Sequence, residues 1–325
     1  MSNQRIVLVA GAIHRAGIDL LKRHDGIAVV EIGQEPERVA AEIGAADALI
    51  VRTARVDRGV IERAHSLRIV ARYGVGFDNV DVPALTARGI PLATVGDANA
   101  RTVAEHMLYM TLALAKHGLA ADRTMRALAW SERDALVGHD LFAKTLLVVG
   151  FGRIGTHVAR MCQALGMSVL VWDPYVADQP IAAAGARRAK DLRAGLSLAD
   201  VVTVHTPLND ETRGLIGADE LAAMPAHAII INCARGGIID EAALAEALAS
   251  RRIAGAGLDV FDHEPPKPDN PLLKLDNVVL SPHTAGLTEE CTARMSLRCA
   301  QSVLDCFAGK LDPALVVNRE VMAPA

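Results

Sequence analysis

Residues 144–155 read KTLLVVGFGRIG, and this stretch decides the fold of the 325-residue chain. The apolar run ends in a Gly-x-Gly-x-x-Gly pattern, and apolar residues at helical spacing follow it. A second apolar run at 168–172 ends at Asp173, near the spacing of about 20 residues at which an acid follows such glycines. Strand, glycine turn, helix, strand and acid in this order are typical of a dinucleotide-binding βαβ unit.

Each residue of this pattern has a physical role. Gly150 permits a tight turn, Gly152 lets backbone N–H groups approach a pyrophosphate, and Gly155 lets the helix pack closely on the strand. The helix N-terminus adds unpaired donors and the positive end of its dipole. Asp173 can accept hydrogen bonds from a ribose diol and repels a 2′-phosphate, and no base follows it directly. Arg153 in the turn can reach a phosphate, but the pattern as a whole favours NAD over NADP.

Composition and charge exclude several classes of protein. The length of the chain suits two domains. Hydrophobic residues make up 51% of it and charged residues 22%, a balance that is sufficient for packed cores. The net charge is −4 with scattered Lys and Arg, which argues against nucleic acid as a partner. No apolar run approaches the ~20 residues of a membrane span, and the N-terminus has no signal-peptide layout. Five cysteines without a C-x-x-C pair indicate reduced thiols in a cytoplasmic protein.

The first 95 residues alternate short strand-like runs with helical patterns, which predicts a parallel sheet covered by helices on both faces. The strand-like runs are 6–10, 48–52, 67–73 and 90–95, and the helical ones are 18–23, 36–43 and 82–88. Tyr73, Gly74, Val75 and Gly76 lie at the end of the third run. They form either an ordinary strand-to-helix turn or a loop whose backbone N–H groups hold an anion.

A second, larger α/β domain is predicted beyond residue 99. Residues 99–119 read as one long helix, apolar on nearly every side and therefore expected to be buried in a domain or between subunits. Glu105 and His106 in that helix are interpreted as surface residues. The segment 131–143 reads as a connector, and a last helix is predicted at 289–308. The predicted strands, six as in a doubly wound dinucleotide domain, are 146–149, 169–172, 201–205, 228–232, 253–258 and 277–280.

Polar residues follow the strands of this second domain, at the edge where open α/β sheets bind ligands. Three successive strand ends carry Arg235, Asp259 and His283, and Glu264 follows shortly after Asp259. Each residue alone is most often a turn or capping residue, but together they supply what hydride transfer at a carbon bearing oxygen needs. A histidine gives or takes the proton, a carboxylate orients the histidine, and an arginine binds a substrate carboxylate as a fork.

Eleven histidines compete for the acid–base role. His205 also ends a strand, but it lies on the adenosine side by chain order and is assigned a structural role. His263 adjoins Glu264 and would point away from it in an extended loop. His283, in a Pro-His-Thr turn after a strand, is the predicted catalytic histidine.

Five motifs occur in order along the chain: GFGRIG at 150–155, NCARGG at 232–237, GLDVF at 257–261, HEP at 263–265 and SPHTA at 281–285. By these motifs the chain resembles the D-isomer-specific 2-hydroxyacid dehydrogenases over essentially its whole length.

Within that family, the stretch RYGVGFDNVD at 72–81 is most similar to the phosphoglycerate dehydrogenase and hydroxypyruvate reductase branch. Arg52 and Arg72 are either ligands of a substrate phosphate or ordinary surface arginines. No regulatory domain is expected after the last helix.

The resemblance implies a fold, a reaction and an assembly. The fold is α/β with two domains: a doubly wound Rossmann NAD-binding domain at 99–286, and a smaller flavodoxin-like substrate domain made of 1–98 plus 287–325. The implied reaction is the NAD-dependent interconversion of a D-2-hydroxy acid and its 2-keto acid, of the hydroxypyruvate, glyoxylate or 3-phosphoglycerate type. It takes place in a cleft between the domains, without a metal, in a homodimer built largely on the cofactor domain.

The resemblance also implies the roles of individual residues. Arg235 binds the substrate carboxylate and carbonyl, His283 is the acid–base, and Glu264 pairs with His283. The turn at 73–76 holds the substrate carboxylate through backbone N–H groups, and Asp259 faces the nicotinamide carboxamide. The implied cofactor-binding set is Thr102, Gly150, Gly152, Arg153, Ile154, Gly155, Asp173, His205, Thr206, Pro207, Cys233, Ala234, Asp259, Ala285 and Gly286.

An NAD(H)-sensing, corepressor-like binding protein on the same fold is the alternative, because such proteins can keep the same Arg, Glu and His. Turnover of a 2-keto acid distinguishes the two functions. A methyltransferase also carries a glycine-rich first turn, but the strand-end Arg and His and the position of the motif in the middle of the chain disfavour that class.

Overall fold

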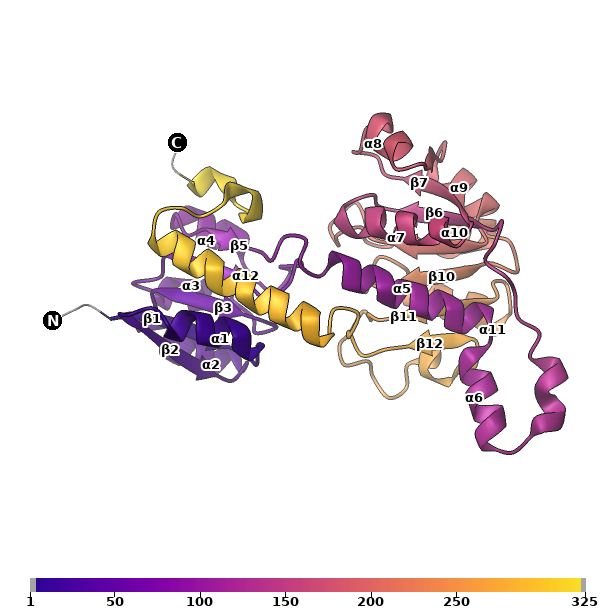
Figure 1. Cartoon of the computed structure of the whole chain (residues 1–325), viewed down its shortest axis with the longest axis horizontal. Coiled ribbons are helices and arrows are strands. Elements are labelled where there is room, and N and C mark those ends of the chain that lie inside the picture. The colour runs from indigo at the N-terminus through magenta and orange to yellow at the C-terminus, as the bar shows by residue number, and fades with distance from the viewer. Residues whose placement is uncertain (1–3, 323–325) are drawn as a thin grey trace. The chain divides into compact units, whose positions relative to one another are not determined.

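The computed structural model describes residues 4–322, which divide into two compact units (Figure 1). Unit 1 comprises the described residues up to Asn99 together with those from Leu287 onward, and unit 2 comprises Ala100–Gly286. The chain therefore leaves unit 1 once and returns to it once. Within residues 4–322, no helix combines the length and the apolar character that crossing a bilayer requires.

Unit 1 contains a five-stranded parallel sheet in the order β2-β1-β3-β4-β5, which is the flavodoxin-like order. The strands are β1 (Arg5–Ala10), β2 (Ile27–Ile32), β3 (Ala48–Val51), β4 (Ile69–Arg72) and β5 (Leu92–Ala93). The helices are α1 (Arg15–Lys22), α2 (Pro36–Glu42), α3 (Arg58–Arg63), α4 (Val82–Ala87) and α12 (Glu289–Phe307), with 3-10 turns η1 (Ile43–Ala45), η4 (Pro313–Leu315) and η5 (Arg319–Val321).

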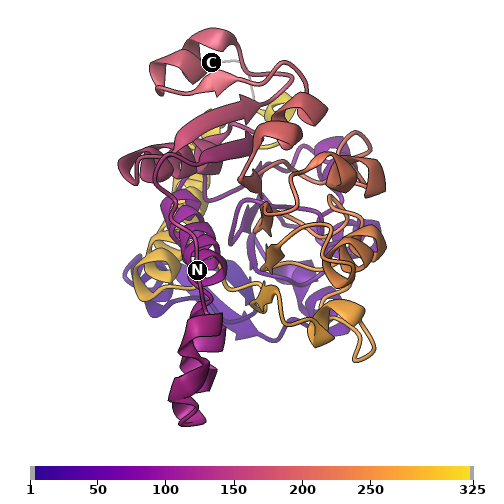
Figure 2. The ribbon, with the colours of Figure 1, turned by 90° about the vertical axis from the view of Figure 1, so that its right-hand side faces the viewer.

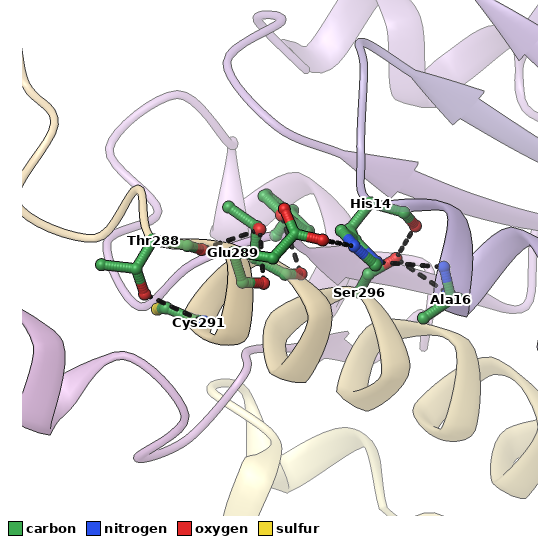
Figure 3. Close-up of polar contacts among 9 residues, drawn as sticks. His14, Ala16, Thr288, Glu289, Cys291 and Ser296 are labelled. Atoms are coloured by element: carbon green, nitrogen blue, oxygen red, sulfur yellow. Dashed lines mark hydrogen bonds and ion pairs between the residues drawn. The ribbon is translucent and has the colours of Figure 1, made fainter.

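The C-terminal helix α12 packs on α1, and its buried residues join those of β1, β3 and α1 in one apolar core. Figure 3 shows the polar contacts between the two helices. The Ser296 hydroxyl donates to the His14 carbonyl at 2.6 Å and accepts from the Gly17 N–H at 3.2 Å. A Cβ on Gly17 would clash with Ser296 Oγ, so this close approach requires a glycine. At the start of α12, Glu289 Oε1 lies 2.9 Å from His14 Nε2.

The first turns of α12 also hold the segment by which the chain leaves unit 1. Thr288 caps the helix by accepting the Cys291 N–H at 3.2 Å (Figure 3). Both Cys291 Sγ, at 3.8 Å, and Arg294 Nε, at 3.1 Å, contact the carbonyl oxygen of Ala98. The end of the outgoing chain and the start of the returning helix are therefore bound to each other within unit 1.

Unit 2 contains a seven-stranded parallel sheet in the order β12-β11-β10-β9-β6-β7-β8. The strands are β6 (Thr145–Val149), β7 (Ser168–Trp172), β8 (Arg187–Arg188), β9 (Val201–Val204), β10 (Ile229–Asn232), β11 (Gly255–Leu258) and β12 (Val278–Leu280). Read from β8, the first six strands follow the doubly wound Rossmann order, and β12 extends the sheet by one. The order reverses between β6 and β9, and such sheets bind ligands at the carboxyl ends of the strands at this point.

Helices cover both faces of this sheet because successive side chains of a strand point to opposite faces. The helices of unit 2 are α5 (Ala100–Ala115), α6 (Gly118–Arg126), α7 (Arg153–Ala164), α8 (Asp178–Ala183), α9 (Leu192–Leu198), α10 (Ala218–Ala223) and α11 (Glu241–Ala249), with 3-10 helices η2 (Trp130–Ala135) and η3 (Pro271–Lys274). Leu146 and Val148 of β6 enter the core that includes α5 and α7, whereas Leu147 and Val149 enter the core that includes α9, α10 and α11.

The predicted long helix at 99–119 is wrong in its extent. It ends at Ala115, and α6 begins only after His117, whose backbone adopts the left-handed region with a φ of 50°. One face of α5 is buried within unit 2, whereas Tyr109 and Leu112 are exposed in the single chain, so burial between subunits stays a prediction for them. In both views of the ribbon, α6 and η2 extend away from the rest of unit 2 (Figures 1 and 2).

Strands β2 and β8 and helix α3 are among the elements that were not predicted. Strand β2, with the sequence IAVVEI, is a sheet-edge strand of which only Ile32 is buried, and its apolar run was overlooked. Strand β8 consists of two arginines and is extended only because it pairs with β7. Helix α3 is a six-residue helix that contributes Val60 and Ile61 to the core.

Candidate active site

The glycine loop joins the end of β6 to α7. Gly150 has a φ of 92°, a region that favours glycine, and a Cβ there would lie 2.9 Å from the His205 carbonyl oxygen. A Cβ on Gly155 would clash with the Gly150 carbonyl oxygen. At Gly152, by contrast, a Cβ would meet nothing within 4 Å in the described part of the chain. The loop is therefore packed against protein at two glycines and open at the third, where α7 begins.

The open side of this loop fits a dinucleotide. Helix α7 has twelve residues, and the unpaired N–H groups of its first turn and its positive dipole end favour an anion beside Gly152. At the adjacent end of β9, His205 Nδ1 and Thr206 Oγ1 are buried and have no hydrogen-bond partner among residues 4–322. Burial lowers the pKa of His205 to about 3, so the ring is neutral. A bound nucleotide, or an ordered water, would satisfy such atoms.

Asp173 ends β7 beside the same loop. Its Oδ2 accepts the Phe151 N–H at 2.8 Å, and its Oδ1 accepts the N–H groups of Tyr175 and Val176 at 2.9 and 3.0 Å. These three bonds fix the carboxylate next to the glycine loop, which is where an acid that binds the ribose of a dinucleotide is expected.

A basic residue that the sequence analysis missed lies next to Asp173. Arg188 of β8 donates to the Asp173 carbonyl at 2.7 Å and also contacts the Val176 carbonyl and the Asp178 carboxylate. Its position depends on the pairing of β8 with β7, which no local pattern indicates. Since its guanidinium is bound to these three acceptors, Arg188 does not overturn the expectation of NAD.

His283 and Glu264 form a close pair, with His283 Nδ1 2.7 Å from Glu264 Oε2. The other carboxylate oxygen, Oε1, accepts the Phe261 N–H at 3.2 Å. Burial alone would raise the pKa of Glu264. However, the hydrogen bond and charge of His283, the Phe261 N–H and the charge of Arg235 together hold it below its usual value. Glu264 is therefore an ionised acceptor for the Nδ1–H of His283, which leaves Nε2 as the nitrogen that can serve a substrate.

Arg235 lies in the turn after β10. Asn232 fixes this turn, since its amide nitrogen donates to the Arg235 carbonyl at 2.8 Å and its amide oxygen accepts the Ala234 N–H at 3.0 Å. A Cβ on Gly236 would clash with the Phe261 carbonyl oxygen, so the turn packs on the segment that leads to Glu264. This packing explains why the charge of Arg235 acts on the pKa of Glu264.

Asp259 is placed next to the turn that carries His283. It is 1% exposed, its Oδ1 accepts the Thr284 N–H at 2.7 Å, and its Oδ2 accepts the Ala285 N–H at 2.9 Å. Its carbonyl oxygen accepts the His283 N–H at 2.8 Å. His283 has a φ of 53°, a conformation uncommon outside glycine, so the contacts of Asp259 hold a strained backbone in place.

The predicted substrate turn lies in unit 1, directly after β4. Tyr73 is buried and donates to the Thr292 carbonyl at 3.0 Å, and burial raises its pKa to about 12. Its hydroxyl is thus committed to the fold rather than to acid–base work. Gly74 has a φ of 141°, and Val75 and Gly76 are half-buried.

The remaining predicted residues fall into two groups within unit 2. At the switch point between β6 and β9 lie the glycine loop, Asp173 and the segment 205–207. At the ends of β10, β11 and β12 lie 233–235, Asp259 and 283–286. Cys233 is buried 3.9 Å from the sulfur of Met110, and burial raises the pKa of its thiol. Thr102 is buried in α5.

A Rossmann sheet with an open glycine loop at its switch point defines a dinucleotide-binding protein of the doubly wound α/β class. Residues 108–285, more than half of the chain, match the family model described as D-isomer specific 2-hydroxyacid dehydrogenase, NAD binding domain. The chain belongs to this family and carries its NAD-binding domain. The residues of unit 2 that fit a dinucleotide lie within the matched range.

Known proteins resemble the chain in both sequence and structure. It is 40% identical over 304 residues to D-3-phosphoglycerate dehydrogenase of Archaeoglobus fulgidus, a match covering 93% of this chain and 57% of that protein. It thus spans little more than half the length of such relatives. The TT0316 protein from Thermus thermophilus superposes with a TM-score of 0.87 at 33% identity, covering 96% of this chain and 99% of that one. D-lactate dehydrogenase from Aquifex aeolicus, complexed with NAD and lactic acid, gives 0.87 at 26% identity, covering 98% and 100%.

Proposed function

We propose that the chain interconverts a D-2-hydroxy acid and its 2-keto acid with NAD as the hydride carrier. The observation that supports this most is the pair of His283 and Glu264, 2.7 Å apart and under the charge of Arg235. Family membership and the printed names of the relatives support the class of substrate. When bound, the nicotinamide supplies the hydride in reduction and accepts it in oxidation.

The chain's own residues handle the proton and the substrate charge. Ionised Glu264 accepts the Nδ1–H of His283, which fixes the orientation of the ring and leaves Nε2 to face the substrate. In reduction, His283 Nε2 gives its proton to the carbonyl oxygen as the carbonyl carbon gains the hydride, and the imidazole becomes neutral. In oxidation, the same nitrogen takes the hydroxyl proton. Arg235 binds the substrate carboxylate as a fork and polarises the carbonyl.

Oxidation of NADH against a panel of 2-keto acids tests this proposal. The panel contains glyoxylate, hydroxypyruvate, pyruvate and phosphohydroxypyruvate, and we expect saturable reduction of at least one. Binding of NADH, followed by its fluorescence, is measured in parallel. If no 2-keto acid of the panel causes oxidation of NADH while NADH still binds, the proposal is contradicted and an NAD(H)-sensing binding protein on the same fold is favoured.

Within this function, we propose that a phosphorylated substrate would be read by Arg52 rather than Arg72. Both arginines are half-buried and donate to a backbone carbonyl, Arg52 to that of Ala12 at 3.3 Å and Arg72 to that of Tyr73. The Arg72 guanidinium also lies where a Cβ on Gly74 would be, so it is folded back onto its own turn. Arg52→Ala should raise the KM for phosphohydroxypyruvate roughly tenfold or more, because a charged hydrogen bond is lost, and leave the KM for pyruvate unchanged. The control is Arg55→Ala in the same loop. Equal effects on both acids would contradict the assignment.

We propose that Asp173 sets the preference for NAD over NADP. Asp173→Ala should lower the ratio of kcat/KM for NAD to that for NADP by about ten- to a hundredfold, since a charged acceptor of the ribose hydroxyls is removed. Because Asp173 also accepts three backbone N–H groups, Asp173→Asn is the matched variant that keeps an acceptor oxygen and removes the charge. A ratio that stays constant in both variants would remove Asp173 from the ribose site.

We propose that the chain forms a homodimer through an arm that comprises residues 116–142. Neither α6 nor η2 in this arm contains a buried residue. Large apolar side chains are exposed there: Leu128 at 88%, Trp130 at 60%, Val137 at 73% and Phe142 at 75%. Apolar surface of this kind marks interfaces, and a short helix without buried contacts gains little stability on its own. A second copy would supply the missing contacts.

Analytical ultracentrifugation tests the dimer. The wild-type chain should sediment as a dimer, and the double variant Leu128→Glu with Trp130→Glu should sediment as a monomer, because two charges would be buried without partners. The matched control is Leu198→Glu, which changes an apolar residue of unit 2 that is 63% exposed outside the arm. A wild-type monomer, or a dimer that survives both charges, would refute this interface.

A further inference from the structure

Helix α5 brings a histidine to the turn that carries His283. His106 Nε2 lies 2.9 Å from the hydroxyl oxygen of Ser281 and 3.6 Å from Oδ1 of Asp259. The His106 side chain is only 18% exposed. The expectation that His106 is a surface residue is therefore wrong, because α5 directs it to the end of β12, more than 170 positions away in the sequence.

The direction of the hydrogen bonds in this cluster follows from its chemistry. The Ser281 hydroxyl donates to Asp259 Oδ1, and a hydroxyl has only one hydrogen to give. Ser281 Oγ must therefore accept from His106, so the Nε2 of His106 carries a hydrogen. The chain of donors runs from His106 Nε2 through Ser281 Oγ to the carboxylate of Asp259.

The carboxylate at the end of this chain is the one that holds the turn of His283. Asp259 Oδ1 receives the Ser281 hydroxyl and the Thr284 N–H, and Oδ2 receives the Ala285 N–H. Asp259 is almost completely buried, and a buried carboxylate depends on the donors around it. Loss of the Ser281 hydroxyl removes a donor from Asp259 directly, and loss of His106 removes the donor that orients this hydroxyl, so either change loosens the bonds of Asp259 to the turn.

We infer that His106 is a positioning residue, which acts through Ser281 and Asp259 to hold the left-handed backbone of His283 and so to aim the imidazole. The imidazole of His283 is then fixed from two sides. Glu264 binds its Nδ1, and the His106–Ser281–Asp259 chain fixes its backbone. His106 itself does not exchange protons with the substrate. The effect of His106 on kcat rests on the proposed function, whereas its effect on the stability of the turn at His283 does not.

Amide hydrogen exchange in the full chain tests the positioning role without any activity. His106→Leu should speed exchange at the Thr284 and Ala285 amides roughly tenfold or more, because the Ser281 hydroxyl loses the donor that orients it towards Asp259 and the turn then opens more often. The amides of β6 serve as the internal reference and should not change. His106→Gln keeps an N–H at a comparable reach and should restore slow exchange. Glu105→Gln, an exposed neighbour on the same helix, is the matched control and should behave as wild type.

A mutant cycle shows whether the effect passes through Ser281. Ser281→Ala should speed exchange at least as much as His106→Leu, and the double variant should be no faster than Ser281→Ala. Additive effects would overturn the chain of donors. Three further results would overturn the inference. The first is unchanged exchange at Thr284 and Ala285 in His106→Leu, and the second is equally fast exchange in the His106→Leu and His106→Gln variants. The third is faster exchange in β6 as well as in the turn.

Kinetics provide the second measurement. In His106→Leu, kcat should fall roughly tenfold to a hundredfold with NADH affinity unchanged, since a displaced acid–base group costs rate rather than cofactor binding. His106→Gln should recover most of the loss. A wild-type chain that reduces no keto acid would contradict the proposed function and leave the exchange result to decide the role of His106. Normal kcat in an otherwise active His106→Leu would overturn the inference.

Discussion

Replacing His283 by asparagine is expected to lower kcat by roughly 10²- to 10⁴-fold while NADH binding stays nearly unchanged. Asparagine tolerates the left-handed backbone that His283 adopts, with its φ of 53°, better than alanine does. The substitution therefore removes the imidazole without forcing the turn to move. Steady-state reduction of the best acid of the panel gives kcat, and quenching of protein fluorescence gives the NADH affinity.

The neighbouring histidine supplies the control for this experiment. His263 precedes Glu264 in the sequence and is exposed, and His263→Ala should leave kcat within about twofold of wild type, as expected for a surface position. Turnover by the His283→Asn variant at the wild-type rate would contradict the assignment of His283 as the acid–base residue. A loss that is equal in both variants would point to the loop as a whole rather than to the imidazole.

The second large effect is expected at Arg235. Arg235→Gln should lower kcat/KM by roughly 10²- to 10³-fold, because the positive charge that polarises the carbonyl and the fork that binds the carboxylate are both removed. Arg235→Lys should recover only part of this loss, since an ammonium is a point charge and cannot reproduce the planar fork. The measurement is kcat/KM for the same acid, with NADH affinity as the internal reference.

Two outcomes at Arg235 would contradict its role. The first is an unchanged kcat/KM in Arg235→Gln. The second is full recovery in Arg235→Lys, which would show that charge alone suffices and that no fork is formed. Arg251→Ala is the matched control, because that arginine also belongs to unit 2 but forms an exposed ion pair with Asp276, and such pairs contribute little.

The parts of the fold that could be predicted from sequence are those in which the residues of the element itself indicate its structure. The stretch at 144–155 contains both an apolar strand and a glycine turn, and the structure forms β6, the open loop and α7 there. Strand β8 could not be found in this way, because two arginines carry no apolar signal and extend only by pairing with β7. The break after α5 depends on the left-handed backbone of His117, and histidine is not a residue type from which a turn is predicted.

The same distinction holds for the site. Arg235, Asp259 and His283 were selected as candidates because each follows a strand, and parallel strands end at one edge of the sheet. Asp259 was expected to face the nicotinamide, an expectation that stays a prediction, but its contacts with the turn of His283 could not be read from spacing. Arg188 and His106 were missed because tertiary packing alone brings them to the site.

The contact between α12 and α1 has a consequence for how the chain is made. Unit 2 is continuous in sequence and can fold as soon as its residues leave the ribosome, since domains generally fold as units. Unit 1 cannot, because residues of α12 complete the core shared by β1, β3 and α1. The first strands synthesised therefore wait, with apolar surface uncovered, until α12 is released. During biosynthesis the strands of unit 1 are made before unit 2 but complete their core after it.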